Sequence, residues 1–285
     1  MTSKTFSLSP SVVKVVRDKG TEQPFSGEYD ECEEAGTYLC RQCGLALFRS
    51  ATKFHSGCGW PSFDDELAGT VKRIPDSDQQ RTEILCNRCD AHLGHVFKGE
   101  GFTAKNLRHC VNSLSLDFVK DLEVIDTEEA IVAAGCFWGV EYYFQKLPGV
   151  LKTEVGYIGG AKDFPSYEEV CQKDTDHYEA LRIIFDKNKI SYESIIKFFF
   201  EIHDFSQVDG QGPDVGPQYL SAIFYYSETQ KNIINKVIAL LDNVATRVLP
   251  VKTFWQAEEY HQNYYQKNKQ QPYCHRYTKR FPPEK

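Results

Sequence analysis

Cysteine is the residue type in this sequence that offers the most chemistry. The 285 residues include ten cysteines, whereas the one methionine is the first residue. A thiolate can bind a metal, attack an electrophile or exchange with a disulfide. The N-terminal segment has no apolar run typical of a secretory signal, so we expect a cytoplasmic protein with reduced thiols. The cysteines are then metal ligands or redox catalysts rather than a disulfide framework.

Four of the cysteines form two C-x-x-C pairs, Cys40 with Cys43 and Cys86 with Cys89. Each pair can turn two thiolates toward one point, and four thiolates complete a closed tetrahedral site for zinc. A residue suited to a tight turn follows each pair, Gly44 after the first and Asp90 after the second. The sequence therefore predicts one structural zinc ion per chain. Iron, or two thiol pairs without a metal, are the alternatives.

Cys136 lies in the sequence Gly135-Cys136-Phe137-Trp138-Gly139, between a predicted strand and a predicted helix. Unpaired N–H groups and the positive end of the helix dipole stabilise a thiolate at such a position. Cys136 is therefore a candidate nucleophile, and the two aromatic residues after it are suited to line an apolar pocket. A buried core cysteine beside core aromatic residues is the alternative.

This segment resembles the A-type peptide-methionine sulfoxide reductases. The resemblance spans residues 128–277 and continues through the motifs SYEEVC (166–171), HYE (177–179), GPDVGPQY (212–219), AEEYHQ (257–262) and YCH (273–275). It implies that Cys136 attacks the sulfoxide sulfur and that Glu179 protonates the sulfoxide oxygen. Glu141 is nearer in sequence but matches no acid of the family. Cys274 matches the resolving cysteine, with a bystander thiol in a disordered tail as the alternative.

The same resemblance implies a set of substrate-binding residues in the second half. Phe137 and Trp138 would hold the S-methyl group, Tyr167 and Tyr219 would hydrogen-bond the sulfoxide oxygen, and Asp214 would order the site. The chain departs from the family pattern at a few nearby positions, which are Asp176, Tyr178, Pro217 and Leu220.

Two more cysteines have distinctive surroundings in the first half. Cys110 lies in RHCVNS (108–113) and Cys58 in SGCGWPSF (56–63), with HLGHVF (92–97) between them. The charge of Arg108 would lower the pKa of the neighbouring Cys110 thiol, and a histidine could exchange a proton near neutral pH.

These segments and the C-x-x-C pairs resemble the B-type methionine sulfoxide reductases over residues 8–119. The resemblance implies Cys110 as nucleophile, Cys58 as resolving cysteine, Trp60 as wall of the methyl pocket and His95 as proton donor. It also implies three residues that order the site: His92, Arg108 and Asn112. The segment after Phe97 differs from the family pattern, so the support of His95 should differ too. Cys32 and Cys171 match no catalytic position and are expected to be structural or incidental.

The implied reaction accounts for these residue types. A thiolate attacks the sulfoxide sulfur while an acid protonates the oxygen, methionine leaves, and the cysteine remains as a sulfenic acid. A second thiol then forms a disulfide, which thioredoxin would reduce by exchange. The A-type half would take the S epimer and the B-type half the R epimer. One chain would thus repair free or protein-bound methionine sulfoxide formed under oxidative stress.

Two other functions remain compatible with parts of the sequence. A thiol–disulfide oxidoreductase or peroxidase would use the same cysteines, but would need neither Trp60 nor the Phe137–Trp138 pocket. A non-enzymatic zinc module that binds a partner would account for the C-x-x-C pairs, but not for Cys110 or Cys136.

The spacing of apolar and turn-forming residues predicts two domains, residues 1–122 and 123–285, joined by a short connector within 121–130. The first reads as mostly β with the four-cysteine zinc site, and its expected strands include 36–40, 92–99 and 111–119. Its B-type resemblance implies two antiparallel sheets. The second alternates strands (130–136, 181–186, 219–226) with helices (139–149, 191–202, 228–241). Its A-type resemblance implies an α/β domain, an α+β sandwich with a ferredoxin-like mixed sheet. Ser191 and Ser227 are the expected caps of the last two helices.

Composition excludes several other classes of protein. The apolar share of 41% and charged share of 26% are typical of globular proteins and exclude disorder and coiled coil. The net charge of -7 and the pI of about 5.7 argue against a nucleic-acid partner, because phosphate binding needs basic side chains. No uninterrupted apolar run approaches the length of a membrane span, so no membrane association is expected.

Overall fold

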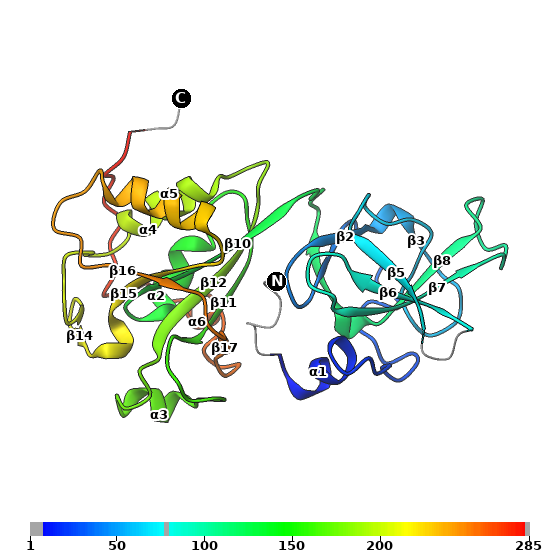
Figure 1. Ribbon diagram of the computed structural model, residues 1–285, viewed down its shortest axis with the longest axis horizontal. Coiled ribbons are helices and arrows are strands. Elements are labelled where there is room, and N and C mark those ends of the chain that lie inside the picture. Colours follow the sequence, from blue (N-terminus) through cyan, green and yellow to red (C-terminus); the bar gives the residue numbers. More distant parts are fainter. Residues whose placement is uncertain (1–7, 77–79, 283–285) are drawn as a thin grey trace. The chain divides into compact units, whose positions relative to one another are not determined.

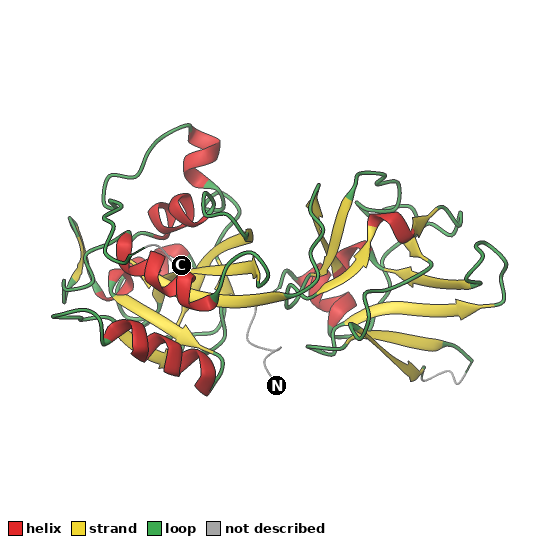
Figure 2. Ribbon diagram, turned by 90° about the horizontal axis from the view of Figure 1, so that it is seen from above, coloured by secondary structure: helices red, strands yellow, loops and turns green. Residues whose placement is uncertain are grey.

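The computed structural model describes residues 8–76 and 80–282, which divide into two compact units (Figure 1). The first unit is Leu8–Thr127 and the second begins at Glu128. This division lies inside the expected connector 121–130, a few residues beyond the expected boundary at 122. Figure 2 shows that strands dominate the first unit and that most of the helices belong to the second.

The first unit contains two antiparallel sheets, one ordered β2-β1-β9 and the other β3-β4-β8-β7-β6-β5. Its strands are β1 (Gly36–Cys40), β2 (Ala46–Arg49), β3 (Lys53–Phe54), β4 (Ser62–Phe63), β5 (Val71–Pro75), β6 (Thr82–Cys86), β7 (His92–Lys98), β8 (Leu107–Val111) and β9 (Leu116–Lys120). Helix α1 (Pro10–Val16) and the 3-10 turns η1 (Ser50–Thr52) and η2 (Ser113–Ser115) complete the described part of this unit.

The larger of these sheets brings the first thiol site together through its register. Cys110 on β8 lies opposite His95 on β7 and opposite Ser62 on β4. The single strand expected over 111–119 was wrong, because the chain turns through η2 between β8 and β9. The turn lets β8 and β9 join different sheets, and alternation of apolar and polar residues cannot reveal such a break.

The second unit is built on a six-stranded mixed sheet ordered β16-β15-β10-β12-β11-β17, in which β15 pairs antiparallel with β10 and parallel with β16. The strands of the whole second unit, inside and outside this sheet, are β10 (Thr127–Ala134), β11 (Val150–Ile158), β12 (Tyr178–Asp186), β13 (Gly210–Gln211), β14 (Asp214–Val215), β15 (Ser221–Tyr225), β16 (Arg247–Pro250) and β17 (Trp255–Gln256). Its helices are α2 (Phe137–Phe144), α3 (Tyr167–Cys171), α4 (Tyr192–Glu201), α5 (Glu228–Ile238) and α6 (Tyr264–Asn268), with the 3-10 turn η3 (Pro217–Tyr219).

Local sequence signals set the ends of the helices. The hydroxyl oxygens of Ser191 and Ser227 accept backbone N–H groups at the first turns of α4 and α5, which confirms both expected caps. Helix α2 spans Phe137–Phe144, so it begins two residues before and ends five residues before the expected helix over 139–149. Buried residues of α2, α4 and α5 pack on the central strands as one apolar core.

No helix in the described part of the chain is long and apolar enough to span a bilayer.

Candidate active sites and a candidate metal centre

The four cysteines of the two C-x-x-C pairs converge at one point of the first unit. Their sulfur atoms all lie within 4.8 Å of one another, and all four residues are buried. The Sγ atoms of Cys40 and Cys89 are 3.6 Å apart, as are those of Cys43 and Cys86. Four Zn–S bonds of about 2.3 Å in a tetrahedron separate the sulfurs by about 3.8 Å, so the cluster fits a zinc ion.

The two C-x-x-C turns have the same backbone hydrogen bonds. The Gly44 N–H donates to the Cys40 carbonyl over 2.7 Å, and the Asp90 N–H donates to the Cys86 carbonyl over 2.9 Å. Gly44 and Asp90 have φ values of 70° and 56°, in the left-handed region that glycine and aspartate tolerate. The turn residues noted in the sequence therefore bend each pair so that both thiols point inward.

The first thiol site pairs Cys110 with Cys58. Their sulfur atoms are 3.7 Å apart although 52 residues separate them in the chain. The hydroxyl of Ser56 donates to the Cys58 sulfur over 3.0 Å, and the guanidinium of Arg108 donates to it over 3.5 Å. Cys58 therefore lies among donors that stabilise a thiolate.

The contact between the two thiols shifts their pKa values in opposite directions. The hydrogen bond with Cys110, followed by that with Ser56, lowers the pKa of Cys58 to about 4 although burial opposes the shift. The same bond to Cys58, together with burial, raises the pKa of Cys110. The Arg108 charge acts to lower the pKa of Cys110, as expected, but Cys58 has the larger and opposite effect. The expected effect of Arg108 is therefore present, but the Cys58 thiol and burial outweigh it in the reduced pair.

A small pocket collects Cys110 and half of the residues expected around it. Its volume is about 110 Å³, and its lining includes Trp60, His95, Cys110 and Asn112. The Nε2 atom of His95 lies 2.7 Å from a carboxylate oxygen of Asp76, which sequence reasoning missed. Asp76 follows β5 in the chain, so no local motif links it to His95.

His92 and Arg108 support this site from outside the pocket wall. His92 is buried, and its Nδ1 lies 2.7 Å from a carboxylate oxygen of Glu83 on β6. Arg108 makes a two-pronged contact with the Glu100 carboxylate over 2.8 and 2.9 Å. Glu100 thus holds the guanidinium where it can reach Cys58.

A buried carboxylate from the N-terminal segment holds the chain beside Asn112. Glu22 accepts the N–H groups of Ser113 and Leu114 over 2.5 and 3.0 Å, and its own N–H donates to the Asn112 side chain over 3.0 Å. The carbonyl of Glu22 accepts the indole N–H of Trp60 over 3.2 Å. Sequence reasoning missed Glu22 because it lies between 38 and 92 residues from its partners.

The second thiol site lies at the start of α2. Cys136 occupies the N-cap position, where β10 has ended and the helix begins, and is 7% exposed. The Phe137 N–H donates to the Glu179 carboxylate over 3.1 Å. Glu179 comes from β12, the neighbour of β10 in the sheet, and is 1% exposed. The predicted strand-to-helix position of Cys136 is confirmed.

Burial controls the acid of this site. Loss of solvent, followed by the nearby Cys136 charge, raises the pKa of Glu179 well above its ordinary value. Burial therefore favours the protonated form of this carboxyl group. A hydrogen bond with the Cys274 thiol, together with burial, raises the pKa of Cys136. The two sulfur atoms therefore lie close together, although Cys136 and Cys274 are 138 positions apart in the sequence.

An aromatic cluster surrounds these groups. Phe137 is buried in the core, whereas Trp138 is partly buried and stacks on Tyr264 with ring centroids 3.6 Å apart. The indole N–H of Trp138 donates to His261 Nδ1 over 3.0 Å, and the Tyr167 ring lies 4.5 Å from the His261 ring. His261 belongs to the AEEYHQ motif but was given no role, and it orders this cluster.

The other residues expected at the site lie near Glu179. Burial, and then the Glu179 charge, raises the pKa of Tyr219, and the same carboxylate contributes to a raised pKa of Tyr167. Asp214 accepts a hydrogen bond over 3.1 Å from the hydroxyl of Tyr273, which is the residue before Cys274. Asp214 thus fastens the segment that carries Cys274.

The C-terminal segment is also held in place after this contact. The N–H groups of Arg276 and Thr278 donate to carbonyls at the end of α4, over 3.3 and 2.7 Å, and Phe281 joins the apolar core. Cys274 is 8% exposed. Cys274 therefore lies in a packed segment beside Cys136, and not in the disordered tail that was the alternative.

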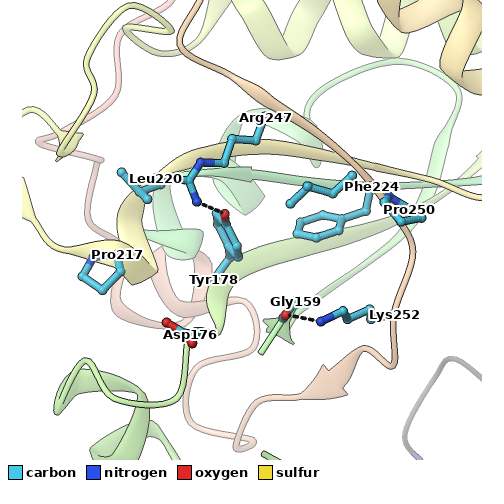
Figure 3. A pocket seen from close by; sticks show the side chains of 10 residues that line it. Gly159, Asp176, Tyr178, Pro217, Leu220, Phe224, Arg247, Pro250 and Lys252 are labelled. Carbon is cyan, nitrogen blue, oxygen red and sulfur yellow. Dashed lines mark hydrogen bonds between the residues drawn. The ribbon is translucent and has the colours of Figure 1, made fainter. Parts of the chain in front are cut away.

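A separate pocket of about 280 Å³ lies beside β12 (Figure 3). Tyr178 points into it and accepts a hydrogen bond from Arg247 over 2.8 Å, while Lys252 donates to the Gly159 carbonyl over 2.9 Å. Its lining includes the positions that depart from the family pattern: Asp176, Tyr178, Pro217 and Leu220. Alternation along β12 places Tyr178 and Glu179 on opposite faces, so this pocket is not the site of Glu179.

Each unit therefore presents a cysteine, a second thiol beside it and a group that can supply a proton, with aromatic residues nearby. This is the arrangement of a thiol-dependent redox enzyme with two sites.

Comparisons with known proteins agree with this class. A family model described as peptide methionine sulfoxide reductase matches residues 128–283, more than half of the chain. A model described as SelR domain matches residues 8–120. The chain belongs to the peptide methionine sulfoxide reductase family and carries a SelR domain in its first half.

Individual relatives match one half each. The peptide methionine sulfoxide reductase MsrA of Pasteurella multocida is 45% identical over 153 residues, which are 52% of this chain and 88% of that protein. The chloroplastic peptide methionine sulfoxide reductase B2 of Arabidopsis thaliana is 54% identical over 115 residues, 40% of this chain and 57% of that protein. The reduced crystal structure of Mxr1 from Saccharomyces cerevisiae is 37% identical, with a TM-score of 0.48, over 52% of this chain and 89% of that one.

Proposed function

We propose that the protein is a repair enzyme that reduces methionine sulfoxide, free or in proteins, back to methionine at two sites. The observation that carries the proposal is the pairing, in each unit, of a cysteine with a second thiol and a proton-donating group. The two family matches, one to each half, support the same reaction. The C-terminal site takes the S epimer and the N-terminal site the R epimer.

At the C-terminal site, the Cys136 sulfur attacks the sulfoxide sulfur while Glu179 gives a proton to the sulfoxide oxygen. Desolvation favours the protonated form of Glu179, which suits it to act as the acid. Tyr167 and Tyr219, which lie near Glu179, donate hydrogen bonds to the same oxygen. The oxygen stays on Cys136 as a sulfenic acid, and methionine leaves.

Apolar contacts select the methyl group of the substrate. The Trp138 indole is held by stacking on Tyr264 and by its bond to His261, so it presents a fixed face. Phe137 completes the wall from the core side. Asp214 orders the site through Tyr273. Because the pocket wall is already fixed, it loses little conformational entropy when the small methyl group of the substrate binds.

The second thiol resolves the sulfenic acid. Cys274 attacks the Cys136 sulfur, the S–O bond breaks, and water leaves as the disulfide forms. The proximity of the two thiols in the reduced chain supports this step.

At the N-terminal site, a proton first passes from Cys110 to Cys58, which makes Cys110 the thiolate. The 3.7 Å separation of the two sulfur atoms supports this exchange. Cys110 then attacks the sulfoxide sulfur, His95 supplies the proton to the oxygen, and Trp60 holds the methyl group. His92, Arg108 and Asn112 order the site. Cys58 forms the disulfide with Cys110.

An external dithiol completes both cycles, and we take thioredoxin as that reductant, because exchange with a dithiol returns each disulfide to two thiols. A cycle of this kind suits a reducing compartment, so we place the protein in the cytoplasm.

The cluster of Cys40, Cys43, Cys86 and Cys89 holds one structural zinc ion. Four thiolates leave no position for a substrate, so the ion stabilises the first unit and takes no part in the reaction. In the second unit the central strand order β15-β10-β12-β11 supports the expected ferredoxin-like sheet.

The test uses the separate epimers of methionine sulfoxide with the full chain and a dithiol. Cys136→Ser should abolish reduction of the S epimer alone, and Cys110→Ser reduction of the R epimer alone. Each variant serves as the folding control for the other. Loss of both activities from either substitution would contradict two independent sites, and turnover with peroxide or disulfides but not with sulfoxides would overturn the proposal.

A further inference from the structure

The imidazole of His275 contacts the thiol of Cys274 directly. Its Nδ1 lies 3.1 Å from the Cys274 sulfur, and its Nε2 lies 2.6 Å from the carbonyl oxygen of Ala134. A carbonyl oxygen can only accept a hydrogen bond, so Nε2 carries the ring proton. In the neutral ring Nδ1 is therefore without a proton and faces the S–H group as an acceptor.

The surroundings keep the ring neutral. His275 is 5% exposed, and burial lowers its pKa to about 4, so it carries no charge at neutral pH. The titratable side chains that face the ring, besides Cys274, are Asp214 and the buried His203. His203 is itself occupied by Ser221 and the Phe199 carbonyl, over 2.8 Å each.

The elements that form the Cys136 site also hold His275. Ala134 ends β10, two residues before Cys136. Gly139 in the first turn of α2 leaves room for the ring, because a Cβ there would lie 2.1 Å from Nδ1. The Tyr143 hydroxyl donates to the His275 carbonyl over 3.3 Å. The ring is thus fixed in the angle between β10 and α2.

We propose that His275 is the base that takes the proton of Cys274 when this thiol attacks the oxidised Cys136. The inference rests on the proposed function, since it assigns a residue to the resolution step. The Cys274 S–H bond breaks as its sulfur forms the S–S bond, and the proton moves to Nδ1. The S–O bond of the sulfenic acid breaks, and its oxygen leaves as water with that proton. The sulfoxide is the oxidant of the whole cycle, so no other reagent is needed.

The first unit activates its resolving thiol by other means. Cys58 is stabilised as a thiolate by the Cys110 thiol, the Ser56 hydroxyl and the Arg108 guanidinium. Cys274 instead faces a neutral base. The two resolution steps should therefore depend differently on pH, although they form the same kind of bond.

The test separates methionine release from disulfide formation in one turnover. The reduced full chain is mixed with one equivalent of the S epimer without reductant and quenched over time. Released methionine is measured, and the Cys136–Cys274 disulfide is measured by alkylation and peptide mass spectrometry. His275→Asn keeps an acceptor oxygen near the Nδ1 position but cannot take a proton. His275→Gln keeps a donor toward the Ala134 oxygen. Tyr143→Phe is the matched control, because it removes one support of the segment and leaves the ring.

In both His275 variants we expect methionine release within about two-fold of the unaltered chain, whereas disulfide formation at pH 7 slows by roughly 100-fold or more. Dimedone should then trap the sulfenic acid on Cys136. The deficit should shrink at pH 9.5, because hydroxide can then accept the thiol proton in place of the imidazole. Tyr143→Phe should behave as the unaltered chain.

Normal disulfide formation in both variants, or a deficit of equal size at pH 7 and pH 9.5, would overturn the role of His275. If the unaltered chain releases no methionine, the proposed function fails instead, so the two failures are distinguishable.

Discussion

Replacing Glu179 by glutamine tests the acid at the C-terminal site. The substitution keeps the size of the side chain and an oxygen that can accept the Phe137 N–H bond of 3.1 Å. It removes the proton that the proposed reaction transfers to the sulfoxide. General acid catalysis contributes roughly 10²- to 10⁴-fold, so Glu179→Gln should lower the rate of S-epimer reduction by that factor. This loss corresponds to about 3–5 kcal/mol of transition-state stabilisation.

Glu141 provides a matched control in the same unit. It is also 1% exposed, and burial raises its pKa to about 7. Its carboxylate accepts the Asn263 N–H over 2.8 Å and the Thr153 hydroxyl over 3.2 Å, so it fastens the start of α6. Glu141→Gln should leave the rate of S-epimer reduction within about three-fold, because this carboxyl group donates no proton to the substrate.

The assay compares initial rates with the S epimer and, as an internal reference, with the R epimer. Both variants should keep the R-epimer rate, since that reaction uses Cys110. The reasoning about Glu179 would be refuted if Glu179→Gln kept more than a tenth of the S-epimer activity. It would also be refuted if Glu141→Gln lost as much activity as Glu179→Gln.

Two further predictions concern stability and metal. Because the folded pKa of Glu141 is raised, its contribution to stability is fully present below about pH 4.5 and is lost as the pH rises through about 7. The unfolding free energy of the second unit, measured by denaturant titration, should fall between pH 5 and pH 8. This fall should be about 2–3 kcal/mol larger in the unaltered chain than in Glu141→Gln. Equal losses in the two proteins would contradict the raised pKa of Glu141. Cys86→Ser should lose the zinc and unfold the first unit more easily while S-epimer reduction continues, and full zinc content by metal analysis would disprove the site.

Local sequence patterns were sufficient to predict the structure around those residues whose conformation depends on their neighbours in the chain. The two C-x-x-C turns bend as Gly44 and Asp90 predict, because a left-handed residue after a pair is a local requirement. The strand before Cys136 and the helix after it also follow from local apolar spacing. The motif resemblance located the two halves that the family models match.

The partners of those residues were decided only by the tertiary structure. Sheet register places Cys110 opposite His95. Loops bring the Cys58 sulfur within 3.7 Å of the Cys110 sulfur, and a carboxylate oxygen of Asp76 within 2.7 Å of Nε2 of His95. Packing of the last segment, likewise, sets Cys274 and His275 against the start of α2. Such contacts join residues far apart in sequence, and their distances depend on the whole fold rather than on any short pattern. The sequence alone thus determined which cysteines can react, and the tertiary structure decided which groups hold their protons.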